Sequence, residues 1–181
     1  MCTDLDFLDR EFSPPNHEVT AFSPGDIILT RSEGFLSRLI SFGQRLRFHG
    51  KYSGWTHAAI IVSPAGDIIE AFHTGIEKNH ISKYRTEAYC LIRVDKVAKG
   101  DDRRQMVRFA DWCLLNQPRY GTLQVVAIAL MLITGWRLYF GLDRRVICSS
   151  LVAKALERTE VIFERDSSFI LPAELAARFK V

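Results

Sequence analysis

Residues 55–72 read WTHAAIIVSPAGDIIEAF, which is the pattern of a β-hairpin. Aliphatic and aromatic residues predict one strand over residues 55–63 and a second over residues 68–72. The Pro-Ala-Gly-Asp stretch at 64–67 supplies a turn between them. The hairpin therefore predicts an antiparallel pair of strands that carries a histidine on one strand and a glutamate on the other.

Further strands and separate helices are predicted on both sides of this hairpin. Strands are predicted at 27–30 and 89–94, and helices at 35–46, 103–116, 149–158 and 173–179. Hairpins and separate helices in one chain indicate an α+β fold. The 181 residues suit a single core. We expect an irregular N-terminal arm over residues 1–22 and one ordered domain over residues 23–181.

The composition is that of a globular domain, with 48% apolar and 25% charged residues. A net charge of +3 and scattered basic residues do not indicate a nucleic-acid partner. The N-terminus lacks the basic start and apolar run of a secretory signal. The longest apolar run, residues 125–133, is too short to span a membrane. We expect a cytoplasmic protein, or one exported without a cleavable signal peptide, with peripheral membrane contact as an alternative. The oligomeric state is left open.

The sequence contains no familiar metal or cofactor motif. Cys2, Cys90, Cys113 and Cys148 form no C-x-x-C pair, so neither a zinc site nor a redox motif is predicted. A P-loop, a G-x-G-x-x-G and an H-E-x-x-H are all missing from the sequence. We therefore expect no metal and no cofactor.

Cys148 and His57 are the candidate nucleophile and base. Cys148 lies in VICSSLV, residues 146–152, where a loop or short strand runs into a predicted helix. The positive end of a helix dipole lowers a thiol pKa. His57 opens an apolar strand and can take the thiol proton as general base. The alternatives are a buried core cysteine and a structural histidine; Cys90 and Cys113 fit core positions.

Glu70 is the candidate third member of the site. A carboxylate inside an apolar strand is costly unless it is paired, and it can orient an imidazole. If Val62 pairs with Asp67, then Glu70 shares a sheet face with His57. A register shifted by one residue puts His73 on that face instead. We favour Glu70 and keep His73 as the alternative.

Five stretches, taken in order, resemble one known family. They are PGDIIL at 24–29, THAAII at 56–61, IEA at 69–71, RYG at 119–121 and ICSSLV at 147–152. They are similar to the circularly permuted branch of the NlpC/P60 papain-like superfamily. This is the YiiX-like group, which is related to lecithin:retinol acyltransferase. Ordinary papain-like enzymes place the cysteine before the histidine, whereas here the histidine comes first, as in the permuted branch.

The resemblance covers roughly residues 23–176. It implies a permuted papain-like fold, in which an antiparallel sheet packs against helices and the nucleophile lies at the start of a helix. It implies a cysteine hydrolase or acyltransferase with the triad Cys148, His57 and Glu70. Tyr120 matches a family tyrosine near the active site that helps to stabilise an oxyanion, and a core aromatic is its alternative. The backbone N–H of Cys148 is a natural oxyanion donor. Gly121 stands where the family often has an acidic residue.

The resemblance leaves two substrate classes open. One branch cleaves amide bonds in cell-wall peptides, and another hydrolyses or transfers acyl chains on lipids; both form an acyl-enzyme. The apolar, aromatic and basic residues over 125–140 suit a lipid interface, with a buried helix as the alternative. The basic residues over 38–51 could contact anionic headgroups. We expect acyl-lipid ester or amide bonds as the substrate. The alternatives are a cell-wall peptide amidase, including a secreted antibacterial effector, and a non-catalytic binding module.

Overall fold

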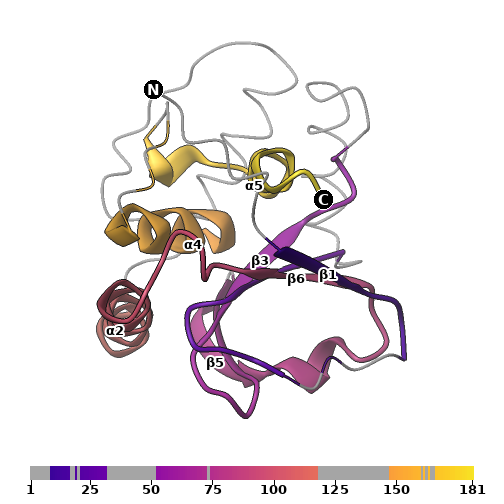
Figure 1. Ribbon diagram of the computed structural model, residues 1–181, viewed down its shortest axis with the longest axis horizontal. Helices are drawn as coiled ribbons and strands as arrows, with labels where there is room; N and C mark the ends of the chain where they lie inside the picture. Colours follow the sequence, from indigo (N-terminus) through magenta and orange to yellow (C-terminus); the bar gives the residue numbers. More distant parts are fainter. Residues whose placement is uncertain are drawn as a thin grey trace.

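The computed structural model describes most of the chain. It describes residues 9–16, 19, 21–31, 52–72, 74–117, 147–159, 161, 163 and 166–181. These residues form an α+β fold with one antiparallel sheet and helices packed beside it (Figure 1). The predicted α+β class, with an antiparallel sheet packed against helices, is therefore confirmed. No helix among these ranges is long and apolar enough to cross a membrane.

The sheet has six strands in the order β1-β6-β2-β3-β4-β5, and all neighbouring strands run antiparallel. The strands are β1 (Asp9–Ser13), β2 (Ile27–Thr30), β3 (His57–Ile61), β4 (Asp67–Phe72), β5 (Gly75–His80) and β6 (Tyr89–Arg93). The α-helices are α2 (Asp101–Asn116), α4 (Cys148–Leu156) and α5 (Pro172–Phe179). Short 3-10 helices are η1 (Ile81–Tyr84), η2 (Glu157–Thr159) and η3 (Ser167–Phe169).

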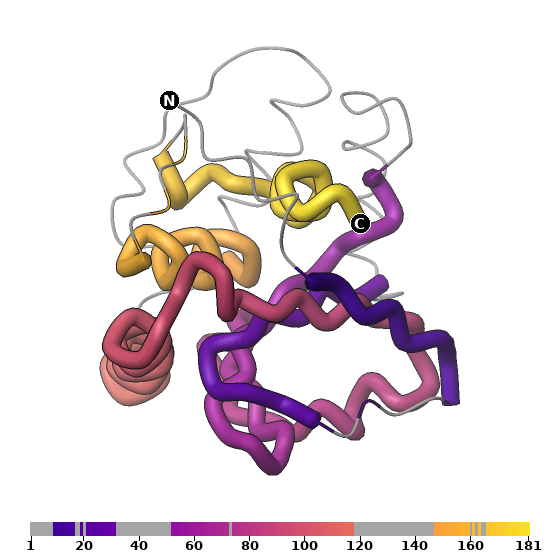
Figure 2. Tube along the Cα trace, in the orientation of Figure 1, coloured from indigo at the N-terminus to yellow at the C-terminus, as the bar shows by residue number. Residues whose placement is uncertain are grey.

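Each face of the sheet carries its own apolar cluster. Leu29 and Ile60 belong to the larger cluster, which includes buried residues of α2, α4 and α5. Ile28 and Ile61, their chain neighbours, belong to the smaller cluster, which Tyr84 of η1 helps to close. The sheet is strongly curved, as the tube in Figure 2 shows. This alternation follows from the two-residue repeat of a strand.

The predicted register of the β3–β4 hairpin is confirmed. The N–H of Val62 donates to the carbonyl of Asp67 over 2.8 Å, and Ala59 lies opposite Glu70. Because opposed residues share a face, His57 and Glu70 lie on the same side of the sheet. The alternative residue, His73, lies outside the described residues.

The expectation of an irregular arm over residues 1–22 was wrong for Asp9–Ser13. This segment forms β1, which pairs with β6 along the edge of the sheet. Four of its five residues are exposed, so β1 shows no alternation of apolar and polar side chains. Main-chain hydrogen bonds to β6 define the strand, and a hydrophobic pattern cannot reveal such a strand.

The segment before β2 joins α2 to the sheet. Asp26 is fully buried and accepts hydrogen bonds from Arg103 of α2 over 2.9 Å and from the N–H of Val94 over 3.3 Å. Gly25 has a φ of +94°, which an L side chain rarely adopts, and a Cβ there would lie 3.3 Å from Arg103. The PGD sequence at residues 24–26 therefore has a structural role rather than a catalytic one.

Helix α4 is the central helix of the molecule. It packs against β3 and β4 and also contacts α2 and α5. At its start, the N–H of Ile147 donates to Ser150 Oγ over 2.8 Å, which satisfies an N-terminal backbone donor. Ser149 Oγ donates to the carbonyl of Ile170 over 2.6 Å. These bonds fix the first turn of α4, and Cys148 is its first residue.

Candidate active site

His57 and Glu70 form a buried pair across the β3–β4 hairpin. His57 Nε2 lies 2.8 Å from Glu70 Oε2. Glu70 is fully buried and His57 is 6% exposed. The chain thus brings together the two residues that the hairpin register predicts to share a face.

The Glu70 carboxylate is surrounded by hydrogen-bond donors. Asn79 Nδ2 and Lys83 Nζ each donate to Oε1 over 2.9 Å. The hydroxyl of Tyr84 donates to Oε2, the oxygen that also contacts His57. Burial alone would raise the pKa of Glu70, but the hydrogen bond and charge of His57, followed by Tyr84 and Lys83, lower it to about 2. Glu70 is therefore an ionised carboxylate that the fold holds in one position.

Tyr84 remains a neutral donor in this arrangement. Its burial and the adjacent charge of Glu70 raise the pKa of its hydroxyl far above the usual value. Sequence reasoning missed Tyr84, together with Lys83 and Asn79. The sequence analysis did not predict β5, which pairs with β4. In that pairing Asn79 lies opposite Ile68 and therefore on the Glu70 face of the sheet, so a prediction of β5 would have identified Asn79.

Cys148 lies against His57 at the start of α4. Burial would raise the pKa of the Cys148 thiol, but the charge of His57 and its hydrogen bond lower it, as do the N–H groups of Ala58 and Ser149. Burial likewise opposes a charged His57, but the charge and hydrogen bond of Cys148, with those of Glu70, raise the pKa of His57 to about 9. The two shifts together favour a thiolate–imidazolium pair.

The backbone geometry explains how the sulfur reaches the histidine. The hydrogen-bonded ladder between β3 and β4 ends at the Ala59–Glu70 pair. One residue earlier, the N–H of Ala58 donates to the sulfur of Cys148. Because Nε2 of His57 is bound to Glu70, Nδ1 is the ring nitrogen left for the thiol. The imidazole thus bridges sulfur and carboxylate.

The imidazole plane is also fixed by a stacked ring. His57 and Phe72 have centroids 4.8 Å apart and planes inclined by 12°. Lys83 Nζ, which forms an ion pair with Glu70, also lies 4.0 Å from the centroid of the Phe72 ring. A ring that is held both by an edge hydrogen bond and by stacking keeps one orientation, which proton transfer requires.

The other described cysteines differ sharply from Cys148. Burial raises the pKa of Cys90 to about 12 and that of Cys113 to about 11. Both belong to the apolar cluster beneath the helices. Their positions agree with the predicted core role, and neither has a histidine partner among the described residues.

Several predicted residues cannot be placed. Tyr120, the 125–140 segment and the basic 38–51 segment lie outside the described residues. The N–H of Cys148, the other predicted oxyanion donor, lies in the first turn of α4, where backbone donors have no acceptor within the helix. Within the described ranges, no group of three or more potential ligand side chains could hold a metal ion.

The arrangement has the parts that acyl transfer requires. A thiolate provides the nucleophile, an imidazolium provides the proton for the leaving group, and a buried carboxylate orients the ring. Comparison of the chain with family models and with curated proteins finds no match.

Proposed function

We propose that the chain is a thiol hydrolase or acyltransferase with the permuted papain-like fold. Cys148 is the nucleophile, His57 the acid and base, and Glu70 the residue that orients His57. The observation that carries this proposal is the position of His57: its Nε2 lies 2.8 Å from the buried Glu70 carboxylate, and the charge and hydrogen bond of the adjacent Cys148 thiol raise its pKa.

The proposed reaction proceeds in two steps. The Cys148 thiolate attacks the carbonyl carbon of an acyl ester, and the N–H of Cys148 stabilises the oxyanion. The carbon–oxygen bond to the alcohol breaks as His57 gives that oxygen its proton, which leaves a thioester on Cys148. His57 then takes a proton from water, whose oxygen attacks the thioester carbon. The carbon–sulfur bond breaks, the acid leaves and the thiolate–imidazolium pair returns. An acceptor alcohol or amine in place of water gives transfer instead of hydrolysis.

We propose acyl-lipid ester or amide bonds, in phospholipids, as the substrate class. The support is the sequence over residues 125–140, where an apolar run is followed by aromatic and basic residues suited to a lipid interface. Cell-wall peptides remain the competing class because the same three side chains would also cleave an amide.

Incubation with phospholipid vesicles and, separately, with muropeptides tests both classes in one experiment. Mass spectrometry of the products and of the intact protein reports cleavage and acylation of Cys148. We expect a fatty-acyl adduct on the protein and released lysophospholipid, both lost in Cys148→Ala and retained in Cys113→Ala. Cleavage of muropeptides without cleavage of phospholipid would assign the activity to cell-wall peptides instead. Absence of any product and any adduct would refute the enzymatic function.

A further inference from the structure

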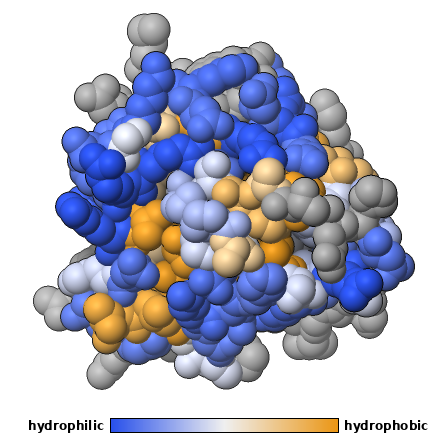
Figure 3. Space-filling view, turned by 60° about the horizontal axis from the view of Figure 1, so that its bottom comes forward, coloured by the Kyte–Doolittle hydropathy of each residue, from blue (hydrophilic) through white to orange (hydrophobic). Residues whose placement is uncertain are grey.

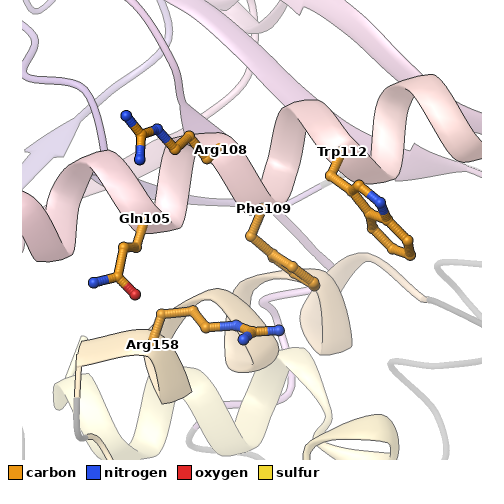
Figure 4. Close-up of a pocket in the computed structure, with 5 residues that line it drawn as sticks. All are labelled: Gln105, Arg108, Phe109, Trp112 and Arg158. Atoms are coloured by element: carbon orange, nitrogen blue, oxygen red, sulfur yellow. The ribbon is translucent and has the colours of Figure 1, made fainter.

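A second cavity lies away from the Cys148 site, between α2 and η2. It has a volume of about 330 Å³ and is lined by Gln105, Arg108, Phe109, Trp112 and Arg158. Figure 4 shows Gln105 and Phe109 extending from α2 toward Arg158 of η2. Arg158 follows the C-terminal end of α4, whereas Cys148 begins that helix, so about 13 Å of helix separates the two places.

Two arginines, Arg108 and Arg158, line this cavity. The Arg158 guanidinium lies 5.1 Å from the Phe109 centroid. No ion pair joins Arg108 or Arg158 to a carboxylate in the part of the chain that the structure describes. Three other arginines are paired: Arg93 with Glu11, Arg103 with Asp26 and Asp95, and Arg104 with Asp101. Among the described residues, the positive charge of the cavity is therefore not compensated by a carboxylate, which suits an anionic ligand.

Exposed apolar side chains border the same cations. Trp112 is 55% exposed and Leu115 is 82% exposed, although both belong to a helix whose other side enters the core. The spacing of Arg108, Trp112 and Leu115 places the three on one stripe of α2. The Phe109 and Trp112 rings stack with centroids 6.5 Å apart. Figure 3 shows one face of the molecule, on which hydrophobic residues reach the surface in patches bordered by hydrophilic ones.

Cations next to an exposed tryptophan and leucine match the boundary between lipid headgroups and acyl chains. Tryptophan places its ring at that boundary, and arginine places its charge at the phosphates. A purely ionic ligand, such as an acidic peptide, would gain nothing from an 82% exposed Leu115. The volume of about 330 Å³ lies at the lower end of small-ligand pockets and suits a headgroup rather than a whole lipid.

We propose that the Arg108–Arg158 cavity binds the anionic headgroup of a phospholipid in a membrane surface, with Trp112 and Leu115 entering the interface. This inference rests on the proposed function, because it supplies the means by which a lipid-cleaving enzyme stays on its substrate surface. Binding at this cavity is separate from the chemistry at Cys148.

Vesicle co-sedimentation of the Cys148→Ala chain tests the proposal without turnover. The two vesicle types are pure phosphatidylcholine and phosphatidylcholine mixed with phosphatidylglycerol. We expect binding to the anionic vesicles only, weakened about fivefold by Arg108→Gln or Arg158→Gln and about 25-fold by both. Trp112→Ala should weaken it too. Arg104→Gln is the matched control, because it removes an equal charge from an exposed, paired arginine on the same helix.

Three outcomes would overturn the proposal. The first is an equal loss in Arg104→Gln, which would indicate a response to net charge alone. The second is unchanged binding in the Arg108→Gln, Arg158→Gln double variant, with its fold verified by circular dichroism. The third is binding of soluble glycerol phosphate as tight as that of vesicles, which would assign the cavity to a free phosphate ester.

A second experiment, on the wild-type chain, separates this proposal from the proposed enzymatic function. Acylation of Cys148 by a water-soluble, short-chain acyl ester needs the catalytic residues but no membrane. If vesicles bind at the cavity and no acylation occurs, the headgroup site is supported and the enzymatic function is refuted. If acylation occurs and vesicles do not bind, the enzymatic function is supported and the headgroup site is refuted.

Discussion

Lys83 donates a hydrogen bond to Glu70 across 2.9 Å, and its half-exposed ammonium connects a fully buried carboxylate to the surface. The same ammonium lies 4.0 Å from the ring of Phe72, on which His57 stacks. One side chain of η1 thus contacts both groups that fix the orientation of His57. Lys83 is a positioning residue, because it acts on the candidate triad through Glu70 and Phe72.

Replacing Lys83 should therefore slow the reaction without removing it. Lys83→Gln keeps a donor but loses the charge, and we expect kcat/KM to fall on the order of tenfold. The side chain is 40% exposed, and solvent screening keeps the effect at this modest level. Lys83→Arg should restore most of the rate. Lys78→Gln is the matched control, since Lys78 lies on the adjacent strand β5 and pairs with the partly exposed Asp67 rather than with Glu70. Equal loss in both variants would show that the effect is one of net charge.

Glu70 should matter much more than the competing residue His73. Glu70→Gln removes the charge that stabilises the imidazolium and leaves His57, Lys83 and Tyr84 facing a neutral amide. We expect kcat to fall by on the order of 10²- to 10⁴-fold, and His73→Ala to change it by less than about threefold. Steady-state kinetics of the two variants decides the matter. A larger loss in His73→Ala would reverse the assignment of the third residue.

The ionised Glu70 should also make stability fall in acid. Its pKa in the folded chain, about 2, lies below the unfolded value near 4.5. The folded state therefore gains stability above pH 4.5 and loses it as the pH falls through 2. For a fully buried group the shift corresponds to about 3 kcal/mol. Urea unfolding across this range should show the loss in the wild type and a flatter profile in Glu70→Gln. Asp111→Asn, which changes an exposed carboxylate of α2, should keep the wild-type slope.

Removing the sulfur should abolish turnover and spare the fold. Cys148→Ala deletes one buried atom and with it a charge whose burial is unfavourable, so we expect a free energy of unfolding within about 1 kcal/mol of the wild type. Cys113→Ala changes a buried core thiol of the same size and should retain activity. Thermal unfolding and turnover, measured on both variants, separate the catalytic thiol from the structural one. Residual turnover in Cys148→Ala near the wild-type level would exclude it as the nucleophile.

The sequence predicts the hairpin and its pair of polar residues well. Apolar strands on either side of a Pro-Ala-Gly-Asp turn allow few registers, and the register with Val62 opposite Asp67 is the one observed. Burial of Glu70 in such a strand already requires a partner, and His57 is the polar residue on the same face. Local pattern is sufficient here because the two residues are only 13 positions apart.

Other parts of the fold and site carry no such local signal. Main-chain bonds to β6 define β1, whose side chains are mostly exposed. Lys83 and Tyr84 lie in a polar stretch that periodicity describes as surface, and only the folding of η1 over the sheet brings them to Glu70. The approach of Cys148 to His57 spans 91 residues and depends on the packing of α4 against β3. Tertiary packing, rather than any local preference, creates these contacts.

A pH titration of thiolate absorbance tests the central pairing of Cys148 with His57 most directly, and it needs no substrate. The ultraviolet difference between the wild type and Cys148→Ala isolates this one sulfur. Because the pKa of Cys148 is lowered and that of His57 is raised to about 9, we expect thiolate to persist below the ordinary thiol pKa of about 8.5 and to depend on His57. His57→Gln should shift the titration to higher pH. A titration midpoint near the ordinary thiol value of about 8.5, unchanged in His57→Gln, would contradict the pairing.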